Sequence, residues 1–262
     1  MHSTSVKLPP KRPAATWSTA PVRFRLISYN IHKGIGGLDR RYRPERIIET
    51  LAACRVDVVL LQEVDDGVPR SDHHRQVDLL GDALGFPHRA FQASVKVSRG
   101  AYGNAILSRF PLAKVEHVDL TVPLKKRRRA LVADCRLPFE HARRLLLCNL
   151  HLGLAGFERK MQLRRLLGSG VLVHHHPIPV IAAGDFNDVY HTLCRRVMRP
   201  AGFETARRLK TFPALLPLRG LDHVYFRGGL RLVRSFAPRT PPAPHASDHL
   251  PIVAEFEVAL PA

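Results

Sequence analysis

The sequence predicts a single domain of the α/β (α+β) class, in which helices pack on β-sheets. In residues 44–55, PERIIETLAACR, apolar side chains recur at the spacing of an amphipathic helix that opens at a proline. The runs VDVVLLQEV (56–64) and IPVIAAGDFND (178–188) are apolar until they stop at polar residues, which is typical of buried strands. With 262 residues and 45% hydrophobic content, the chain can bury one large core.

Similar patterns predict the remaining elements. FRLISYNI alternates apolar and polar side chains from Phe24 and then meets glycines, so we expect a strand that ends near Asn30. Residues 72–85 and 156–173 are expected to be helical, and 200–220 to be loop with some helix. Short runs separated by proline, glycine or charge predict further strands within 101–108, 112–122, 128–137, 143–153, 221–226 and 247–258.

We expect a disordered tail, residues 1–21, followed by one domain, residues 22–262. The tail is rich in proline, serine, threonine and lysine and lacks the apolar stretch of roughly 7–15 residues that a secretory signal requires. No run of about 18 apolar residues occurs, so no transmembrane segment is expected. Without CxxC pairs, the cysteines are expected to be buried thiols of a reducing compartment, the cytoplasm. The protein is expected to be a monomer. The cysteines are Cys54, Cys135, Cys148 and Cys194.

The formal charge of +19 predicts a positive surface potential that attracts phosphate-rich ligands such as nucleic acid or anionic lipid headgroups. A basic surface that serves only solubility is the alternative. The run KKRRR, Lys125 to Arg129, is either a groove for a polyanion or a solvated hairpin edge, and the sequence favours neither. The triple histidine at 174–176 lacks the spaced ligands of a zinc site, so we interpret it as part of a loop.

Polar side chains gather at the ends of the expected strands. The residues concerned are Asn30, Glu63, His151, Asp185, Asn187, Asp222, Asp248 and His249. Each alone has an ordinary explanation, as a turn cap, a surface acid or a core histidine. Strands packed in sheets bring such ends to one rim, where a metal ion would offset the cost of burying polar groups. The coincidence of so many strand ends therefore predicts a single functional site.

The same segments form an ordered series of motifs: SYNIHKG, LLQEV, GNAILSRFP, NLHLG, AGDFND, LDHVYF and SDHLPI. This series closely resembles that of the endonuclease/exonuclease/phosphatase (DNase I-like) superfamily, over roughly residues 24–257. IHKG followed by DRRY, and TFPALLPLRGLDHVYF, resemble a bacterial subgroup of uncharacterised metal-dependent hydrolases. The resemblance implies a four-layered α/β sandwich, with two mixed β-sheets face to face and helices outside.

Hydrolysis of a phosphodiester requires that the protein neutralise phosphate charge and activate a water molecule. Mg²⁺ supplies charge neutralisation and prefers oxygen ligands, so the Glu63 carboxylate and the Asn30 amide oxygen are the candidate protein ligands. Asp248 resembles a third, often water-mediated, ligand of the family, although it could instead bond neighbouring backbone amides. Mn²⁺ is the alternative ion.

The resemblance also implies the catalytic residues. Asp222 resembles the residue that orients His249, and this pair is one candidate for the base that deprotonates the attacking water. In the other reading Asp185, held by Asn187, is the base and His249 stabilises phosphate charge. The sequence does not separate these readings. Because the carboxylates of Glu63 and Asp248 are expected beside it and would repel its charge, we expect Asp185 to have an unusual pKa.

Three further residues are candidates for contact with the phosphate. His151 resembles a histidine that contacts the scissile phosphate in DNase I-like, sphingomyelinase-like and inositol-phosphatase-like members. Asn104 in GNAILS is expected to point toward the phosphate, and Lys33 either does so or is a solvated surface lysine. Abasic-site endonucleases usually carry other residues at the His151 motif and an Asn-Gly step after the first strand, where this chain has His32-Lys33-Gly34. That departure disfavours an abasic-site repair enzyme.

Two classes of function follow. The first is a Mg²⁺-dependent phosphoesterase that hydrolyses a phosphodiester in nucleic acid or a phospholipid-type substrate, by in-line attack of an activated water. The second is a non-catalytic basic protein that binds nucleic acid or anionic membrane. A pure binder gains nothing from clustered carboxylates on a phosphate-binding rim, so the sequence favours the enzyme. The 7% of aromatic residues are thinly spread, which argues against sequence-specific recognition of bases.

Overall fold

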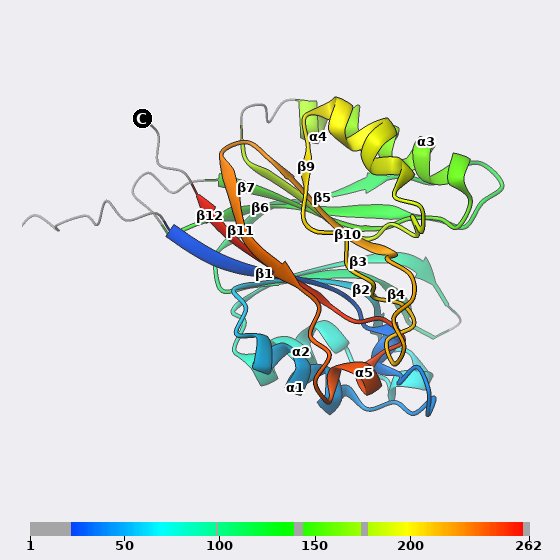
Figure 1. The fold of residues 1–262 in the computed structure, drawn as a ribbon. Helices are drawn as coiled ribbons and strands as arrows, with labels where there is room; N and C mark the ends of the chain where they lie inside the picture. The colour runs from blue at the N-terminus through cyan, green and yellow to red at the C-terminus, as the bar shows by residue number, and fades with distance from the viewer. Residues whose placement is uncertain (1–21, 98, 139–143, 174–177, 259–262) are drawn as a thin grey trace, which may run out of the picture.

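Two six-stranded sheets pack face to face at the centre of the protein (Figure 1). The computed structural model describes residues 22–258 except 98, 139–143 and 174–177. Helices cover the outer face of each sheet, α1 and α2 on one side and α3 and α4 on the other. The expected four-layered sandwich is therefore confirmed, whereas the expected tail and the triple histidine lie outside the described residues.

The first sheet has the strand order β11-β12-β1-β2-β4-β3 and the second the order β5-β6-β7-β8-β10-β9. Each sheet is mixed, because β1 pairs with β2 and β7 with β8 in parallel while the other pairs are antiparallel. The first sheet contains β1 Val22–Asn30, β2 Val58–Asp66, β3 His88–Lys96, β4 Ala101–Ser108, β11 Leu230–Phe236 and β12 Ile252–Val258. The second contains β5 Leu112–Asp119, β6 Arg129–Arg136, β7 Arg144–His151, β8 Val180–Asp185, β9 Glu204–Thr205 and β10 Asp222–Arg227.

The helices are mostly short. They are α1 Pro44–Cys54, α2 Gln76–Leu84, α3 Gly156–Leu167, α4 Gly170–Val173 and α5 Ala243–Ala246. Single helical turns occupy His32–Gly34, Pro69–Ser71 and Arg199–Ala201, and a π-helix occupies Cys194–Met198. None of the helices in the described ranges combines the length and apolar character needed to cross a membrane.

Apolar side chains form three main layers of core. One lies between the sheets and includes Leu60 and Leu147, and the others lie between each sheet and its helices. Strands β2 and β8 contribute to the cores on both of their faces, which explains why their sequences are continuously apolar rather than alternating. All four cysteines are buried free thiols, as expected.

Several elements differ from the sequence-based expectations. The helix expected over 156–173 is divided, because α3 ends at Leu167 with Gly168 as its C-cap. The Ser169 hydroxyl donates to the Leu166 carbonyl at 2.6 Å, just before α4 begins. The helix expected over 72–85 starts only at Gln76. Strands β3 and β11 were not predicted, since both lie at sheet edges where half-exposed side chains weaken the apolar pattern.

Strand β2 does not end at Glu63, as its sequence suggested, but continues through a β-bulge. Leu61 pairs with Ala105 and Val64 with Gly103, so two residues of β2 face one of β4. Glu63 takes up the extra length with a φ of 55°. A bulge of this kind bends the strand and redirects a side chain, here that of an acidic residue.

A buried side chain from the opposite sheet holds this bulge. Asn149 of β7 donates from its Nδ2 to the carbonyl oxygens of Leu61 and Ala105, each at 2.8 Å. Its Oδ1 accepts a hydrogen bond from Gln62 Nε2 at 2.7 Å. Because Asn149 is fully buried, these bonds satisfy carbonyl groups at the irregular point of the ladder that water does not reach.

Replacement of Asn149 by leucine tests this role. Asn149→Leu conserves approximate volume but removes the side-chain donor from two buried carbonyl groups, so we expect the free energy of unfolding to fall by about 2–4 kcal/mol. Urea denaturation followed by circular dichroism measures the change. An unchanged denaturation midpoint would show that the bulge does not depend on the Asn149 amide.

Candidate active site

The register of the strands places polar residues of both sheets at one edge. In the second sheet, Asp185 at the end of β8 lies beside His151 at the end of β7 and Asp222 at the start of β10. Asn30 ends β1 of the first sheet, and its Nδ2 donates to Asp185 Oδ2 at 3.2 Å. The polar side chains of the two sheets therefore meet at this edge.

A cavity of ≈ 720 Å³ opens over this edge. Its polar lining includes Asn30, Glu63, His151, Asp185, Asn187 and His249. Four cations, Lys125, Lys126, Arg128 and Arg219, line it as well. Within the described ranges, four of the candidate residues stand outside this lining, namely Lys33, Asn104, Asp222 and Asp248.

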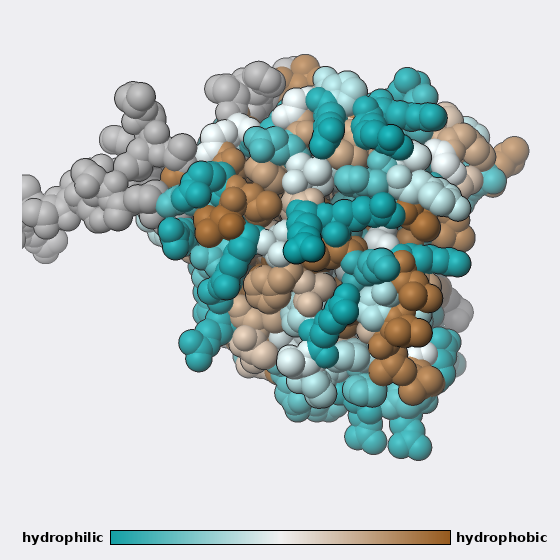
Figure 2. Space-filling model, viewed as in Figure 1, coloured by the Kyte–Doolittle hydropathy of each residue, from teal (hydrophilic) through white to brown (hydrophobic). Residues whose placement is uncertain are grey.

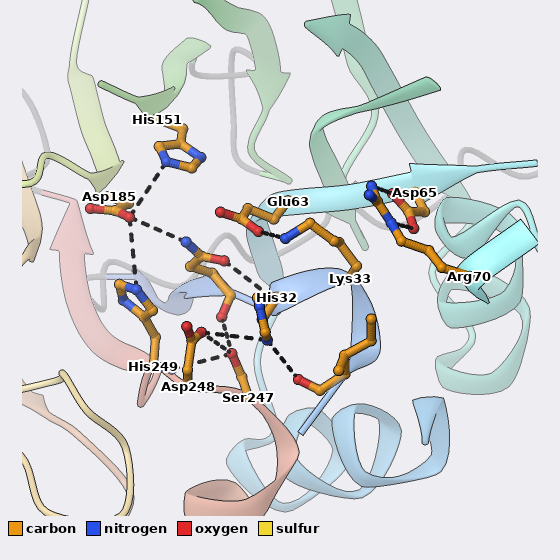
Figure 3. Close-up of polar contacts among 12 residues, drawn as sticks. His32, Lys33, Glu63, Asp65, Arg70, His151, Asp185, Ser247, Asp248 and His249 are labelled. Atoms are coloured by element: carbon orange, nitrogen blue, oxygen red, sulfur yellow. Dashed lines mark hydrogen bonds and ion pairs between the residues drawn. The ribbon is translucent and has the colours of Figure 1, made fainter. Parts of the chain in front are cut away.

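Asp185 lies at the centre of the polar contacts. Its Oδ1 accepts the backbone N–H of Asn187 at 2.9 Å, and Asn187 is fixed in turn by a bond from its Nδ2 to the Leu152 carbonyl at 3.0 Å. The Nε2 atoms of His151 and His249 lie 3.6 and 3.9 Å from Asp185 Oδ2, on opposite sides of the carboxylate (Figure 3).

The charge state of Asp185 follows from this environment. Burial and the negative charge of Asp222 raise the pKa of the Asp185 carboxyl to about 6, although His249 and the bonds from Asn187 and Asn30 act in the opposite direction. The expected unusual pKa is therefore present, with Asp222 as its charged neighbour in place of Glu63 and Asp248. At neutral pH this carboxylate is largely ionised and close to its titration range.

His249 is held by Asp222. Its Nδ1 lies 2.9 Å from Asp222 Oδ2, which also accepts the Thr211 hydroxyl at 2.5 Å. Burial alone would lower the pKa of the His249 ring, but the carboxylates of Asp222 and Asp185 raise it to about 10. His249 is therefore an imidazolium at neutral pH, with its Nε2 facing Asp185.

His151 has the opposite character. Burial and the positive charge of Arg128 lower the pKa of its ring well below the usual range, despite the nearby Glu63 carboxylate. At neutral pH the His151 ring is neutral, so it carries one N–H donor and one acceptor.

Glu63, on the bulge of β2, is ionised and paired. The Lys33 ammonium contacts its carboxylate, and both side chains are largely shielded, with 17% and 19% of their surfaces exposed for Lys33 and Glu63 (Figure 3). Burial would raise the pKa of Glu63, yet the charge of the His151 ring in its protonated form and the charge and hydrogen bond of the Lys33 ammonium hold it at about 2. Lys33 is thus no freely solvated lysine.

The oxygen-rich lining suits a divalent cation. The Glu63 carboxylate and the Asn30 amide line the same cavity, and both offer the oxygen ligands that Mg²⁺ prefers. Ligand atoms of Asp185, Asp222 and His249 also lie within 4.8 Å of one another. Because His249 bonds Asp222 through Nδ1 and is protonated at neutral pH, that second group fits an ion less well than Glu63 does.

Asp248 lies beside the cavity instead of in its lining. Its Oδ1 is 3.3 Å from the Ser247 hydroxyl and 3.9 Å from His32 Nδ1. Gly37 packs directly against it, since a Cβ at Gly37 would lie 2.7 Å from the Asp248 Cα. Asp248 as a metal ligand stays a prediction.

Two other candidates have clear positions. Asn104 Nδ2 donates to the Arg129 carbonyl at 3.2 Å, which ties β4 to the start of β6 beside the cavity. Of the KKRRR run, Lys125, Lys126 and Arg128 line the cavity. A groove for a polyanion stays a prediction.

Sequence reasoning missed three residues at the site. Thr211, bonded to Asp222, lies in a segment with no periodic pattern, and Arg219 gave no signal beyond its charge. Glu158 of α3 lines the cavity and accepts from Gln162 Nε2 at 3.1 Å. The glycine of NLHLG was a usable signal for Glu158, because a Cβ at Gly153 would lie 2.0 Å from the Glu158 Cδ.

Known proteins share this architecture. The uncharacterized protein YbhP of Escherichia coli K12 is 28% identical over 259 residues, which cover 92% of this chain and 98% of that protein. The endonuclease/exonuclease/phosphatase structure from Beutenbergia cavernae has a TM-score of 0.71 at 21% identity, over 90% of this chain and 72% of that one. ANGEL2, described as a 2',3'-cyclic phosphatase, has a TM-score of 0.70 at 19% identity, over 92% of this chain and 97% of that one.

The match to a family model extends over nearly the whole of the described domain. The model of the Endonuclease/Exonuclease/phosphatase family matches residues 27–249, a range that begins within β1 and ends at His249. All ten candidate site residues, from Asn30 to His249, lie in this range. The chain therefore belongs to the Endonuclease/Exonuclease/phosphatase family.

Proposed function

We propose that the protein is a Mg²⁺-dependent phosphoesterase that hydrolyses a phosphodiester by in-line attack of an activated water. The observation that carries the proposal is the shared cavity. Its lining combines an ionised Glu63, an Asp185 with a pKa of about 6 and a protonated His249 with several lysine and arginine side chains. The cations suit a phosphate group, and the carboxylates suit a metal ion and a base. The description of ANGEL2, of the same fold, as a phosphatase is consistent with this activity.

Glu63 and Asn30 would hold the ion, with Asp248 as the further candidate ligand. Mg²⁺, or Mn²⁺ in its place, neutralises charge on the phosphate and on the leaving oxygen when bound. Glu63 is available for this role because its low pKa keeps it ionised at every physiological pH. Lys33 balances the charge of Glu63, and with an ion bound in its place the Lys33 ammonium would be available to the phosphate.

Among the two candidate bases, the charge states favour Asp185. With a pKa of about 6, Asp185 is mostly ionised at neutral pH and can accept a proton from water, while Asn187 and Asn30 fix its orientation. His249, held protonated by Asp222, is a poor base but a good stabiliser of negative charge on phosphate oxygens. The neutral His151 adds a hydrogen bond to the same group.

The first test is hydrolysis of a panel of phosphoesters with and without Mg²⁺, comprising plasmid DNA, single-stranded DNA, RNA, phospholipids and small phosphate esters. We expect Glu63→Gln to lower Mg²⁺-dependent turnover at least about 100-fold, because the variant loses the anionic ligand of the ion. His249→Ala should lower turnover by a similar factor, because the variant loses the positive charge that stabilises negative charge on the phosphate oxygens.

The matched control for this test is Glu116→Gln, on the exposed side of β5 and away from the cavity, which should retain full activity. Circular dichroism shows that each variant is folded. Undiminished turnover in folded Glu63→Gln would contradict the assignment of the metal site, and silence of the wild type on every ester would favour the non-catalytic binder.

The pH dependence of turnover tests the choice of base. Asp185 must be deprotonated to act, so the rate should rise as the pH increases through about 6 and then level off. It should fall again only at strongly alkaline pH, where His249 loses its proton. Asp185→Asn should abolish the acidic limb together with most of the activity. A rate that decreases as the pH rises toward neutrality would exclude Asp185 as the base.

A further inference from the structure

Exposed apolar side chains surround the mouth of the cavity. Leu124 has 104% of its surface exposed and precedes the lining residue Lys125, and Leu154, itself part of the lining, has 78% exposed. Phe157, also exposed, lies beside them with the Lys125 ammonium 5.4 Å from its ring centroid. Single exposed leucines are ordinary, but a group around one opening is characteristic of a binding surface.

A second group lies on the loop between β9 and β10, which contributes Phe212 and Arg219 to the lining of the cavity. Thr211, Phe212 and Arg219 close this loop through backbone hydrogen bonds, and the N–H of the buried Ala214 donates to the Asp248 carbonyl at 2.8 Å. The loop is therefore well anchored, yet its tip presents Leu215, Leu216 and Leu218 with 53%, 67% and 61% of their surfaces exposed. Figure 2 shows this apolar surface at the right of the view, over the segment that joins β9 to β10 in Figure 1.

The segments that supply most of the lining are strongly basic. The segments 121–128, 152–165, 189–199 and 206–221 supply most of the lining residues and carry many lysines and arginines. Glu158 is the one acidic residue in these described segments, and it is buried. A rim that combines exposed leucines with an excess of positive charge complements an anionic lipid surface, which takes up apolar side chains and attracts cations.

We propose that this surface, the lipid rim, seats the mouth of the cavity on an anionic phospholipid bilayer, so that the substrate is the phosphoester of a phospholipid headgroup. The lipid rim consists of Leu124, Leu154, Phe157, Leu215, Leu216 and Leu218 with the cations of the four segments. Its apolar character continues into the cavity through Ala155, Val189 and Leu221, which would contact the part of a lipid next to its phosphate. The substrate class rests on the proposed phosphoesterase function.

A nucleic acid would explain the positive charge but not the leucines. Grooves for nucleic acid combine cations with aromatic or polar side chains that stack on or bond to bases. The lipid rim instead exposes aliphatic side chains on an anchored loop, where contact with a phosphate backbone would leave them in water. The leucines therefore favour the lipid.

The test is co-sedimentation of the full chain with vesicles of phosphatidylcholine alone or mixed with an equal part of phosphatidylglycerol. We expect binding to the mixed vesicles, and we expect the triple variant Leu215→Ser, Leu216→Ser, Leu218→Ser to weaken it at least about tenfold. These residues do not line the cavity, so hydrolysis of a soluble phosphodiester by the variant should be unchanged. The matched control replaces three exposed apolar residues on other parts of the surface, Val115→Ser, Val173→Ser and Phe236→Ser, and should bind vesicles normally.

The two proposals fail in different ways. If the wild type stays in the supernatant with mixed vesicles, or if the triple variant binds them as the wild type does, the lipid rim is refuted whatever the hydrolytic activity. Salt-sensitive binding to DNA without vesicle binding would also overturn it, in favour of nucleic acid. If the wild type binds mixed vesicles but does not hydrolyse the soluble phosphodiester, the result counts against the proposed phosphoesterase function and not against the lipid rim.

Discussion

The bulge in β2 is the constraint on which the site depends. A regular strand alternates its side chains between the two faces, and the extra residue at Gln62 and Glu63 breaks that alternation just where β2 passes the cavity. Asn149 from the opposite sheet donates to two buried carbonyl groups at the bulge. One amide thus joins the two sheets and fixes the strand from which Glu63 reaches the cavity.

Each carboxylate of the site is paired with a positive charge or a hydrogen-bond donor. Three buried or shielded carboxylates in one region would repel each other, but each has a cationic or donor neighbour. Lys33 pairs with Glu63, His249 bonds Asp222, and Asp185 lies between two histidines and two amides. The protein therefore keeps Glu63 ionised and Asp185 near its titration range, two charge states that a hydrolytic site needs at neutral pH.

Much of this arrangement could be predicted from the sequence, because strand ends are local features. Apolar runs that stop at Asn30, His151 and Asp185 reveal both the strands and their polar ends, and the ordered motifs indicated the layered sandwich. Local patterns could not reveal Asn149 or Thr211, whose roles depend on partners 88 and 11 residues away in the chain. The edge strands β3 and β11 were not predicted, because half-exposed strands lack the continuous apolar pattern of buried ones. The placement of Asp248 outside the cavity lining depends on packing against Gly37, which spacing alone does not encode.

Diffraction from crystals soaked in Mn²⁺ tests the central claim most directly, because anomalous difference density locates the ion without reference to activity. The account predicts a peak in the cavity, bonded to a Glu63 carboxylate oxygen, with the Lys33 ammonium moved away from that carboxylate. A peak among Asp185, Asp222 and His249, with Lys33 still paired to Glu63, would contradict it and would assign the metal to the second sheet.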